Sequence, residues 1–335
     1  MSRPKNKEEY RQEMAEAFAN VLEEKGLEWR KEWAGTGGGA PHNGITKACY
    51  RGSNAFWLSL VSMMKGYSDP RWVTMVQIMD KDSKYHPKEK WHLKAGSKAT
   101  YVEYWYPFDL KDKKALTWEQ YKQEIQNGRR EDEFKLSTKY TAVFNAADVE
   151  GMPDISIPKN EDVQMDEMVR KLSEGMGVPI LLDGGDRAYY SPHQDKIHLP
   201  TPGSFENEYA FNSTALHELS HSTGHPTRLN RPQSGMFGTS QYAYEELVAE
   251  MCSCFMGFDL QAQASNSHID NHKAYVQSWI QAIREKPETL IKAIKDAQSA
   301  ASYMDWKAGL ITEQEYEKAK RSVMEIKVKS REIER

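Results

Sequence analysis

The sequence has few cysteines and no long apolar run. Its three cysteines, Cys49, Cys252 and Cys254, are too few, and odd in number, to form a disulfide framework. It contains no run of about 18 apolar residues, the length that a membrane-spanning helix needs. The first ten residues are basic and then acidic, with no apolar segment behind them, which argues against a secretory signal. We therefore expect a reduced, cytoplasmic protein with no membrane partner.

Charge and tryptophan are unevenly distributed along the 335 residues. The net charge is −4, yet residues 1–150 carry 25 Lys and Arg against 22 Asp and Glu, and residues 41–102 carry 10 against 4. Seven of the nine tryptophans precede residue 120. A basic, aromatic first half and an acidic second half predict two domains with different partners.

The hydropathy pattern of the first half predicts a mixed domain over residues 1–152. We expect helices at 6–33 and 54–66 and strands at 91–108 and 139–149. The charged segment 111–137 between the two strands is expected to be an excursion around a short helix. The fold class is therefore α+β.

Prolines and charges at 151–162 mark a domain boundary, and a second domain is expected over 160–308. Its three short strands, at 178–183, 187–192 and 196–200, are expected to form a small antiparallel sheet of hairpins. Five helices are predicted, at 161–177, 205–224, 241–258, 268–285 and 287–305. Residues 309–335 are expected to form a charged C-terminal helix.

The sharpest motif is His217-Glu218-Leu219-Ser220-His221. Histidines four residues apart lie on one face of a helix, so both imidazoles reach one ion. Glu218 lies about 100° around the helix, given ~3.6 residues per turn, where it can take a proton from metal-bound water. H-E-x-x-H on a helix therefore predicts a hydrolytic Zn²⁺ site.

A catalytic zinc needs a third protein ligand. His225 is excluded because, on a continued helix, it would lie about 12 Å from His217 at ~1.5 Å per residue. The predicted helix 241–258 offers Glu246, which has Glu250 one turn later, where it can hydrogen-bond the imidazole of a metal ligand from behind. We predict Glu246 as ligand, with Glu245 or Glu250 as alternatives.

Other features near the motif have structural interpretations. Cys252 and Cys254 point to different faces of a helix and are interpreted as buried thiols rather than zinc ligands. His268 and His272 lack an adjacent Glu and are interpreted as solvated. The segment 196–200 is expected to be an edge strand with which a peptide could pair. Tyr242 or Tyr244 is a candidate to stabilise an oxyanion, although core or surface tyrosine explains both as well.

Basic residues alternate with aromatics in the first half, as on surfaces that bind single-stranded nucleic acid. An ordinary core with a rim of Lys and Arg is the alternative interpretation. No helix-turn-helix or zinc-finger spacing is present, so duplex recognition is not indicated. The candidate DNA-binding residues are Lys47, Tyr50, Arg51, Trp72, Lys94 and Lys98.

Over residues 5–305 the chain resembles the ArdC family of antirestriction proteins, which is found on mobile elements. The resemblance is carried by NGITKACYRGSN (43–54), RWVTMVQ (71–77), WHLKAGSKATYVEYW (91–105), YTAVFNAADVEGMP (140–153), LHELSHSTGHPTRLNR (216–231) and FGTSQYAYEELVAEM (237–251). It implies a single-stranded-DNA-binding domain followed by a zincin-like metallopeptidase domain similar to SprT-type and ImmA/IrrE-type proteases.

The resemblance also implies roles for individual residues. His217, His221 and Glu246 would bind the metal, Glu218 would be the general base, and Tyr50, Arg51 and Trp72 would contact DNA. Two segments depart from the family pattern, the insertion at 111–134 and the charged stretch between Gln77 and Trp91.

The sequence thus predicts a zinc peptidase that binds single-stranded DNA and shields incoming mobile-element DNA from restriction. Its protein substrate would be a DNA-bound or restriction-system protein. Two alternatives stay open: a DNA-binding module whose zinc only braces the fold, and a zinc peptidase whose basic half docks protein substrates.

Overall fold

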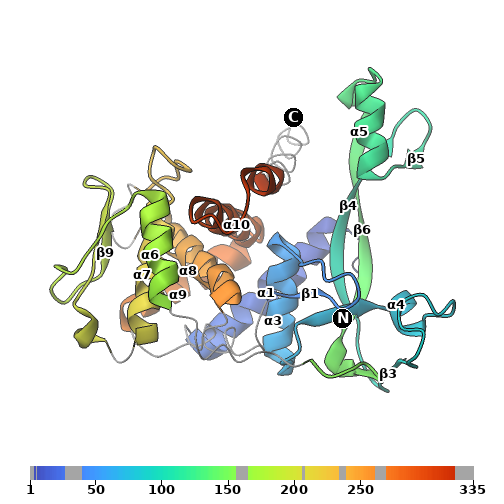
Figure 1. Cartoon of the computed structure of the whole chain (residues 1–335), viewed down its shortest axis with the longest axis horizontal. Helices are drawn as coiled ribbons and strands as arrows, with labels where there is room; N and C mark the ends of the chain where they lie inside the picture. The colour runs from blue at the N-terminus through green and yellow to red at the C-terminus, as the bar shows by residue number, and fades with distance from the viewer. Residues whose placement is uncertain are drawn as a thin grey trace. The chain divides into compact units, whose positions relative to one another are not determined.

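The computed structural model describes residue 4 and residues 6–26, 40–155, 165–205, 208–233, 239–260 and 269–320. Both helices and small sheets are present, which confirms the predicted α+β class. The chain divides into two compact units, which are described separately (Figure 1). Unit 1 comprises Met1–Tyr10, Asn43–Ala48 and Arg71–Pro153, and unit 2 comprises Arg11–His42, Cys49–Pro70 and Asp154–Arg335.

Unit 1 is built on a five-stranded sheet with the order β1-β2-β6-β4-β5. Its strands are β1 (His42–Asn43), β2 (Arg71–Thr74), β4 (Thr100–Asp109), β5 (Lys114–Ala115) and β6 (Phe134–Asn145). β6 pairs antiparallel with both β2 and β4. Its pairing with β4 is unbroken from Thr100↔Val143 to Asp109↔Phe134, so the two strands form a long ribbon.

Helix α4 (Met75–Met79) follows β2, and β3 (His92–Leu93) pairs with β7 (Val149–Glu150) beside the sheet. The predicted strand region at 91–108 contains β3 and most of β4, and the region at 139–149 contains the second half of β6. β6 begins earlier than expected, at Phe134, because its first half pairs with the second half of β4.

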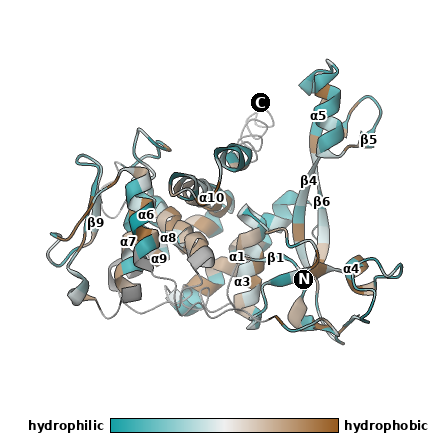
Figure 2. Cartoon of the chain, in the orientation of Figure 1, coloured by the Kyte–Doolittle hydropathy of each residue, from teal (hydrophilic) through white to brown (hydrophobic). Residues whose placement is uncertain are grey.

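The charged segment that follows β4 folds into the tip of the ribbon. β5 pairs with the end of β4, and α5 (Trp118–Gln126) is capped by Thr117, whose side chain accepts a backbone N–H of the first helical turn. Arg129 donates two hydrogen bonds, of 2.6 and 3.1 Å, to the buried carboxylate of Asp109. The Arg129 guanidinium holds the pKa of Asp109 well below its ordinary value. Figure 2 shows that this end of the ribbon is mostly hydrophilic.

A buried histidine organises the charged stretch between Gln77 and Trp91. The ring nitrogens of His86 lie 2.9 Å from the Glu89 carbonyl oxygen and 2.8 Å from that of Gln77. A neutral imidazole donates only one hydrogen bond, so both carbonyls are satisfied only by the protonated ring. Burial opposes this charge, but the carbonyls and the nearby Asp80 outweigh it and raise the pKa of His86 above its ordinary value. Trp91 stacks on the ring at a centroid distance of 4.0 Å.

Unit 2 combines the C-terminal helices with two helices from the first half of the chain. Its helices are most of α1 (Lys7–Lys25), and α3 (Gly52–Lys65), α6 (Met165–Met176), α7 (Glu208–Ser222), α8 (Ser240–Leu260), α9 (Ile269–Glu285) and α10 (Glu288–Lys307). Arg284 of α9 binds Glu16 and Glu23 of α1, and the N–H of Gly52 donates to Gln298 of α10. The compact units therefore interleave along the chain, whereas the predicted domains are consecutive segments.

The small sheet of unit 2 has the order β8-β10-β9. Its strands are β8 (Ile180–Leu181), β9 (Tyr189–Ser191) and β10 (Lys196–His198). β10 pairs antiparallel with β9 but parallel with β8, so the sheet is mixed where hairpins alone are predicted. The reason lies at Gly184, whose N–H donates to the Leu199 carbonyl and which lies against the backbone of His198. The chain therefore passes the end of β10 before it forms β9.

This order also corrects the predicted edge strand. The segment 196–200 contains β10, which is the central strand, with β8 on one side and β9 on the other. Both of its edges are occupied, so it cannot pair with a further peptide. β9 is the edge strand on the side of helix α7.

The C-terminal segment is described only in part. Residues 313–320 are helical, and Tyr316 stacks on Trp306 at a centroid distance of 4.6 Å. The rest of the predicted helix, 321–335, lies outside the described residues. In the part of the chain that the structure describes, no helix is long and apolar enough to cross a membrane.

Raising the pH is expected to loosen the loop around His86. Its folded pKa lies above the unfolded value of about 6.5, so the stabilisation is complete below that pH and is lost as the pH rises through the folded pKa. The C2–H NMR signal of His86 should titrate with a midpoint above about 6.5. A midpoint below that value would contradict the protonated ring, and His86→Phe should remove this contribution to the pH dependence of stability.

Candidate metal centre

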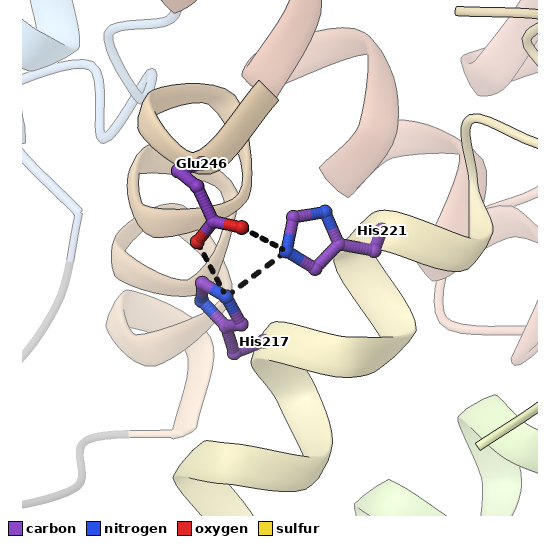
Figure 3. A group of neighbouring side chains, drawn as sticks. All are labelled: His217, His221 and Glu246. Carbon is purple, nitrogen blue, oxygen red and sulfur yellow. Dashed lines mark hydrogen bonds and ion pairs between the residues drawn. The ribbon is translucent and has the colours of Figure 1, made fainter. Parts of the chain in front are cut away.

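Helix α7 places His217 and His221 one turn apart on the same side (Figure 3). The rings meet edge to face with centroids 4.7 Å apart, and their Nε2 atoms are 3.1 Å apart. The chain reverses just after the second histidine, where the N–H of Gly224 bonds to the His221 carbonyl and the N–H of Arg231 bonds to that of Gly224. The four-residue spacing of the two histidines on this helix thus brings one nitrogen of each imidazole close to the other.

Helix α8 supplies the third group. Oε2 of Glu246 lies 3.5 Å from Nε2 of His217, and its Oε1 lies 3.5 Å from Nε2 of His221. One donor atom from each of the three residues lies within 4.8 Å of the others, and Glu246 is 3% exposed. Figure 3 shows the three side chains converging from the two helices. Two imidazole nitrogens and one carboxylate, buried and convergent, form a donor set that suits a zinc ion.

A second carboxylate faces the far nitrogen of each histidine. Oε1 of Glu250 lies 3.7 Å from Nδ1 of His217, and Oε1 of Glu245 lies 3.4 Å from Nδ1 of His221. The sequence predicts Glu250 in this outer position, and it offers Glu245 only as an alternative ligand. The structure places Glu245 behind His221 because neighbouring helix residues are about 100° apart. Such outer partners fix the tautomer and orientation of a metal-binding imidazole.

Arg231 is a part of the site that sequence reasoning missed. Its guanidinium donates to both oxygens of Glu245, at 2.6 and 3.0 Å, and also to Thr223 and to the Ser220 carbonyl. Burial disfavours the ionised form of Glu245, but hydrogen bonds from His221 and Arg231 outweigh it and lower the pKa of this carboxyl. The only sequence signal was a basic residue seven positions after the Gly224 turn.

The carboxylates also act on the imidazole between them. Burial disfavours charge on His221, but Glu246 and Glu245 outweigh it and raise the pKa of His221 to about 9. The site is thus an acidic cluster that favours a positive charge at its centre. A bound metal ion would supply that charge in place of the proton, since an imidazole ligand must be neutral.

Glu218, the predicted base, is buried beside the histidines and held by the edge strand of the small sheet. Its Oε2 accepts a hydrogen bond of 2.7 Å from the backbone N–H of Tyr190 in β9. The Tyr190 hydroxyl donates to Asp195 at 2.7 Å, and Arg228 contacts both of these groups as well as the Ser222 carbonyl. These contacts attach the β9–β10 hairpin to the end of α7.

The other candidates near the motif lie outside this cluster. His225 contacts Thr227, and the Tyr244 hydroxyl donates to Asp296 at 2.8 Å. Cys252 and Cys254 are buried thiols, as predicted, and burial raises the pKa of Cys252 to about 12. His268 and the side chain of His272 lie outside the described residues.

The predicted DNA-binding residues differ in exposure. Lys47, Arg51, Lys94 and Lys98 are exposed, and Tyr50 is half-buried. Trp72 is only 1% exposed, so the structure does not support it as a stacking residue. Its strand, β2, lies between β1 and β6 in the sheet, and the first three residues of the strand are all buried. Tyr50 and Arg51 belong to unit 2, and the three lysines belong to unit 1.

Removing Arg231 is expected to destabilise the metal-free protein. Arg231→Met leaves the buried Glu245 carboxylate without its guanidinium, which costs about 3–5 kcal/mol in the free energy of unfolding. Urea unfolding measures the loss. Arg170→Met, which breaks an exposed pair with Glu174, is the control and should cost about 1 kcal/mol at most. Equal losses in the two variants would contradict the role of Arg231.

The chain is similar to known proteins over both halves. Residues 8–144 match the N-terminal domain of anti-restriction factor ArdC, and residues 167–296 match the zincin-like metallopeptidase family. The fold is similar to the metal-free and Mn(II)-bound crystal structures of the antirestriction ArdC protein from the R388 plasmid, each with a TM-score of 0.67. Identities are 25% and 26%, over 90% of this chain and 98% and 99% of those chains.

Curated relatives include two Escherichia coli proteins named DNA primase TraC, 31% and 30% identical over 89% of this chain. The chain spans only 27% and 20% of their lengths. Uncharacterized protein y4eC of Sinorhizobium fredii is 28% identical over 85% of this chain and 87% of its own length. The two matched domains, in this order, and the likeness to ArdC along most of the chain show that it belongs to the ArdC family of antirestriction proteins.

Proposed function

We propose that the protein is a zinc-dependent peptidase that binds single-stranded DNA and protects incoming mobile-element DNA from restriction. The proposal of a peptidase rests on His217, His221 and Glu246, whose side chains converge next to Glu218 and are buried or nearly so. The antirestriction role follows from membership of the ArdC family. The TraC names add nothing to this proposal, because the chain spans only a minor part of those proteins.

The three convergent residues would hold Zn²⁺, with Glu250 and Glu245 behind the two imidazoles. A zinc ion with such ligands acidifies water and polarises a carbonyl group. The protein's own contribution is to bury the donors, to set the imidazole tautomers and to keep negative charge around the ion.

Glu218 acts as the general base. It would accept a proton from the attacking water and then give that proton to the leaving amine. The backbone N–H of Tyr190 holds one of its oxygens, which leaves the other for proton transfer. Arg228 and Asp195 support this arrangement indirectly, because they hold the hairpin that carries Tyr190.

The peptide substrate would bind in an extended form along β9. This strand is the edge of the small sheet on the side of α7, and extended peptides pair with strand edges. The N–H of Tyr190 is donated to Glu218, so the peptide would pair through the other backbone groups of this edge. A peptide bound there would lie next to Glu218. The substrate is proposed to be a protein bound to DNA or part of a restriction system.

Single-stranded DNA would bind through the basic first half of the chain. Lys47, Lys94 and Lys98 are exposed in unit 1, and residues 41–102 carry a balance of 10 basic to 4 acidic residues. Lysine ammonium groups of this kind bind the phosphate backbone, so the binding does not depend on the base sequence.

Glu218→Gln is expected to abolish proteolysis and to keep zinc. Losing a general base lowers the rate about 10²- to 10⁴-fold, while the three metal-binding side chains are unchanged. The zinc-loaded protein is incubated with single-stranded DNA, and cleavage of itself and of added casein is followed by gel electrophoresis. Glu174→Gln, an exposed change on α6, is the control. Undiminished cleavage by Glu218→Gln would rule out this mechanism.

If neither the wild type nor the variant cleaves, yet both bind DNA and zinc, the protein is a DNA-binding module with a structural zinc.

Affinity for a labelled single strand is expected to fall steeply with salt. Each phosphate contact contributes about −0.7 to the slope of log affinity against log salt. Lys94→Gln with Lys98→Gln should make the slope less steep by about 1.4. Fluorescence anisotropy at several salt concentrations measures it, with Lys171→Gln on α6 as control. A slope unchanged by the double substitution would remove these lysines from the interface.

A further inference from the structure

One face of the β4–β6 ribbon carries a row of aromatic side chains and lysines. Alternate residues of a strand lie on the same face, so Tyr104, Tyr106 and Phe108 share a face of β4. The register places Lys139 opposite Tyr104 and Lys135 opposite Phe108. Three rings and two ammonium groups therefore lie side by side on two paired strands.

The opposite face of the ribbon is used inside unit 1. Trp105 and Tyr140 both donate hydrogen bonds to Glu103, and the Tyr140 ring packs against Tyr10. Asp109, also on this face, holds Arg129 of the tip. These internal contacts are made on the opposite face, and they stabilise the ribbon that carries the aromatic face.

The aromatic face is accessible and positively charged. Tyr104 is 44% exposed, and Lys135 and Lys139 are exposed. The ammonium of Lys139 lies 4.9 Å from the Tyr104 ring and 6.0 Å from the Tyr106 ring, and that of Lys135 lies 5.1 Å from the Phe108 ring. Between Thr100 and Phe108 and between Lys135 and Val143, the residues on this face include no Asp or Glu. The face therefore favours an anionic partner that has flat apolar groups.

We infer that this aromatic face is a stacking platform for single-stranded DNA. Successive rings are about 7 Å apart along the strand, at ~3.4 Å per residue. This spacing is twice the ~3.4 Å between neighbouring bases in a stack. Successive rings of the strand therefore have the same spacing as every second base of a stacked single strand. The lysines beside the rings bind the phosphates and bring the bases to them, as on other platforms that bind single strands without sequence preference.

The platform is a different part of unit 1 from the lysines predicted from the sequence. Lys94 follows β3, and Figure 1 places β3 and the β5 tip at opposite ends of the ribbon. The inserted segment that departs from the family pattern forms this tip and fixes the end of the platform through Arg129 and Asp109. The inference rests on the proposed binding of single-stranded DNA and assigns it a surface.

The test compares a labelled 15-nucleotide dT strand with an abasic strand of the same length. Both have the same phosphates, but only the dT strand has bases to stack. The wild type should bind dT at least tenfold more tightly than the abasic strand. Tyr104→Ala with Tyr106→Ala should bring the two affinities together and leave the salt slope unchanged. Tyr104→Trp should keep the preference for dT, since tryptophan also stacks.

Thr138→Ala, on the opposite face of the same ribbon, is the control and should bind like the wild type. Lys135→Gln with Lys139→Gln should instead make the salt slope less steep by about 1.4. Circular dichroism and thermal melting confirm that each variant is folded. Wild-type affinity for dT in the folded double alanine variant would overturn the platform and leave DNA binding itself standing. No binding of either strand by the wild type would refute the proposed DNA-binding function, and the platform with it.

Discussion

The cluster of carboxylates around two imidazoles is the constraint on which the zincin-like half of the molecule depends. Glu245, Glu246 and Glu250 come from a short stretch of α8, and all are buried against His217 and His221. Buried carboxylates are costly unless positive charge compensates them. Arg231 supplies part of that charge from outside. A metal ion at the centre would supply the rest, so carboxylates that are costly to bury alone favour metal binding.

The path of the chain around the small sheet decides how Glu218, the proposed base, is held. The passage past the end of β10 makes β9 the edge strand and turns the N–H of Tyr190 towards Glu218. A simple meander of hairpins would have put a different strand at the edge. The Arg228–Asp195–Tyr190 contacts then attach this hairpin to the end of α7. The proposed metal ligands, the proposed base and the edge strand are thus positioned by one continuous set of contacts.

In the N-terminal half, burial separates aromatic residues that look alike in the sequence. Trp72 lies in a strand inside the sheet and is part of the core, whereas Tyr104 lies on a ribbon that continues beyond β2. The tip formed by the inserted segment secures the far end of that ribbon through a buried ion pair. The inserted segment, which departs from the family pattern, therefore supports the end of the aromatic face on the ribbon.

The sequence alone determined the features that depend on local periodicity. The four-residue spacing of His217 and His221, and Glu250 one turn after Glu246, follow from 3.6 residues per helical turn. Only the tertiary structure decided which edge of the sheet is open, that Arg231 reaches Glu245, that Trp72 is buried, and that α1 and α3 pack with the C-terminal helices. These depend on contacts between residues far apart in the chain, and no local pattern encodes which partners meet.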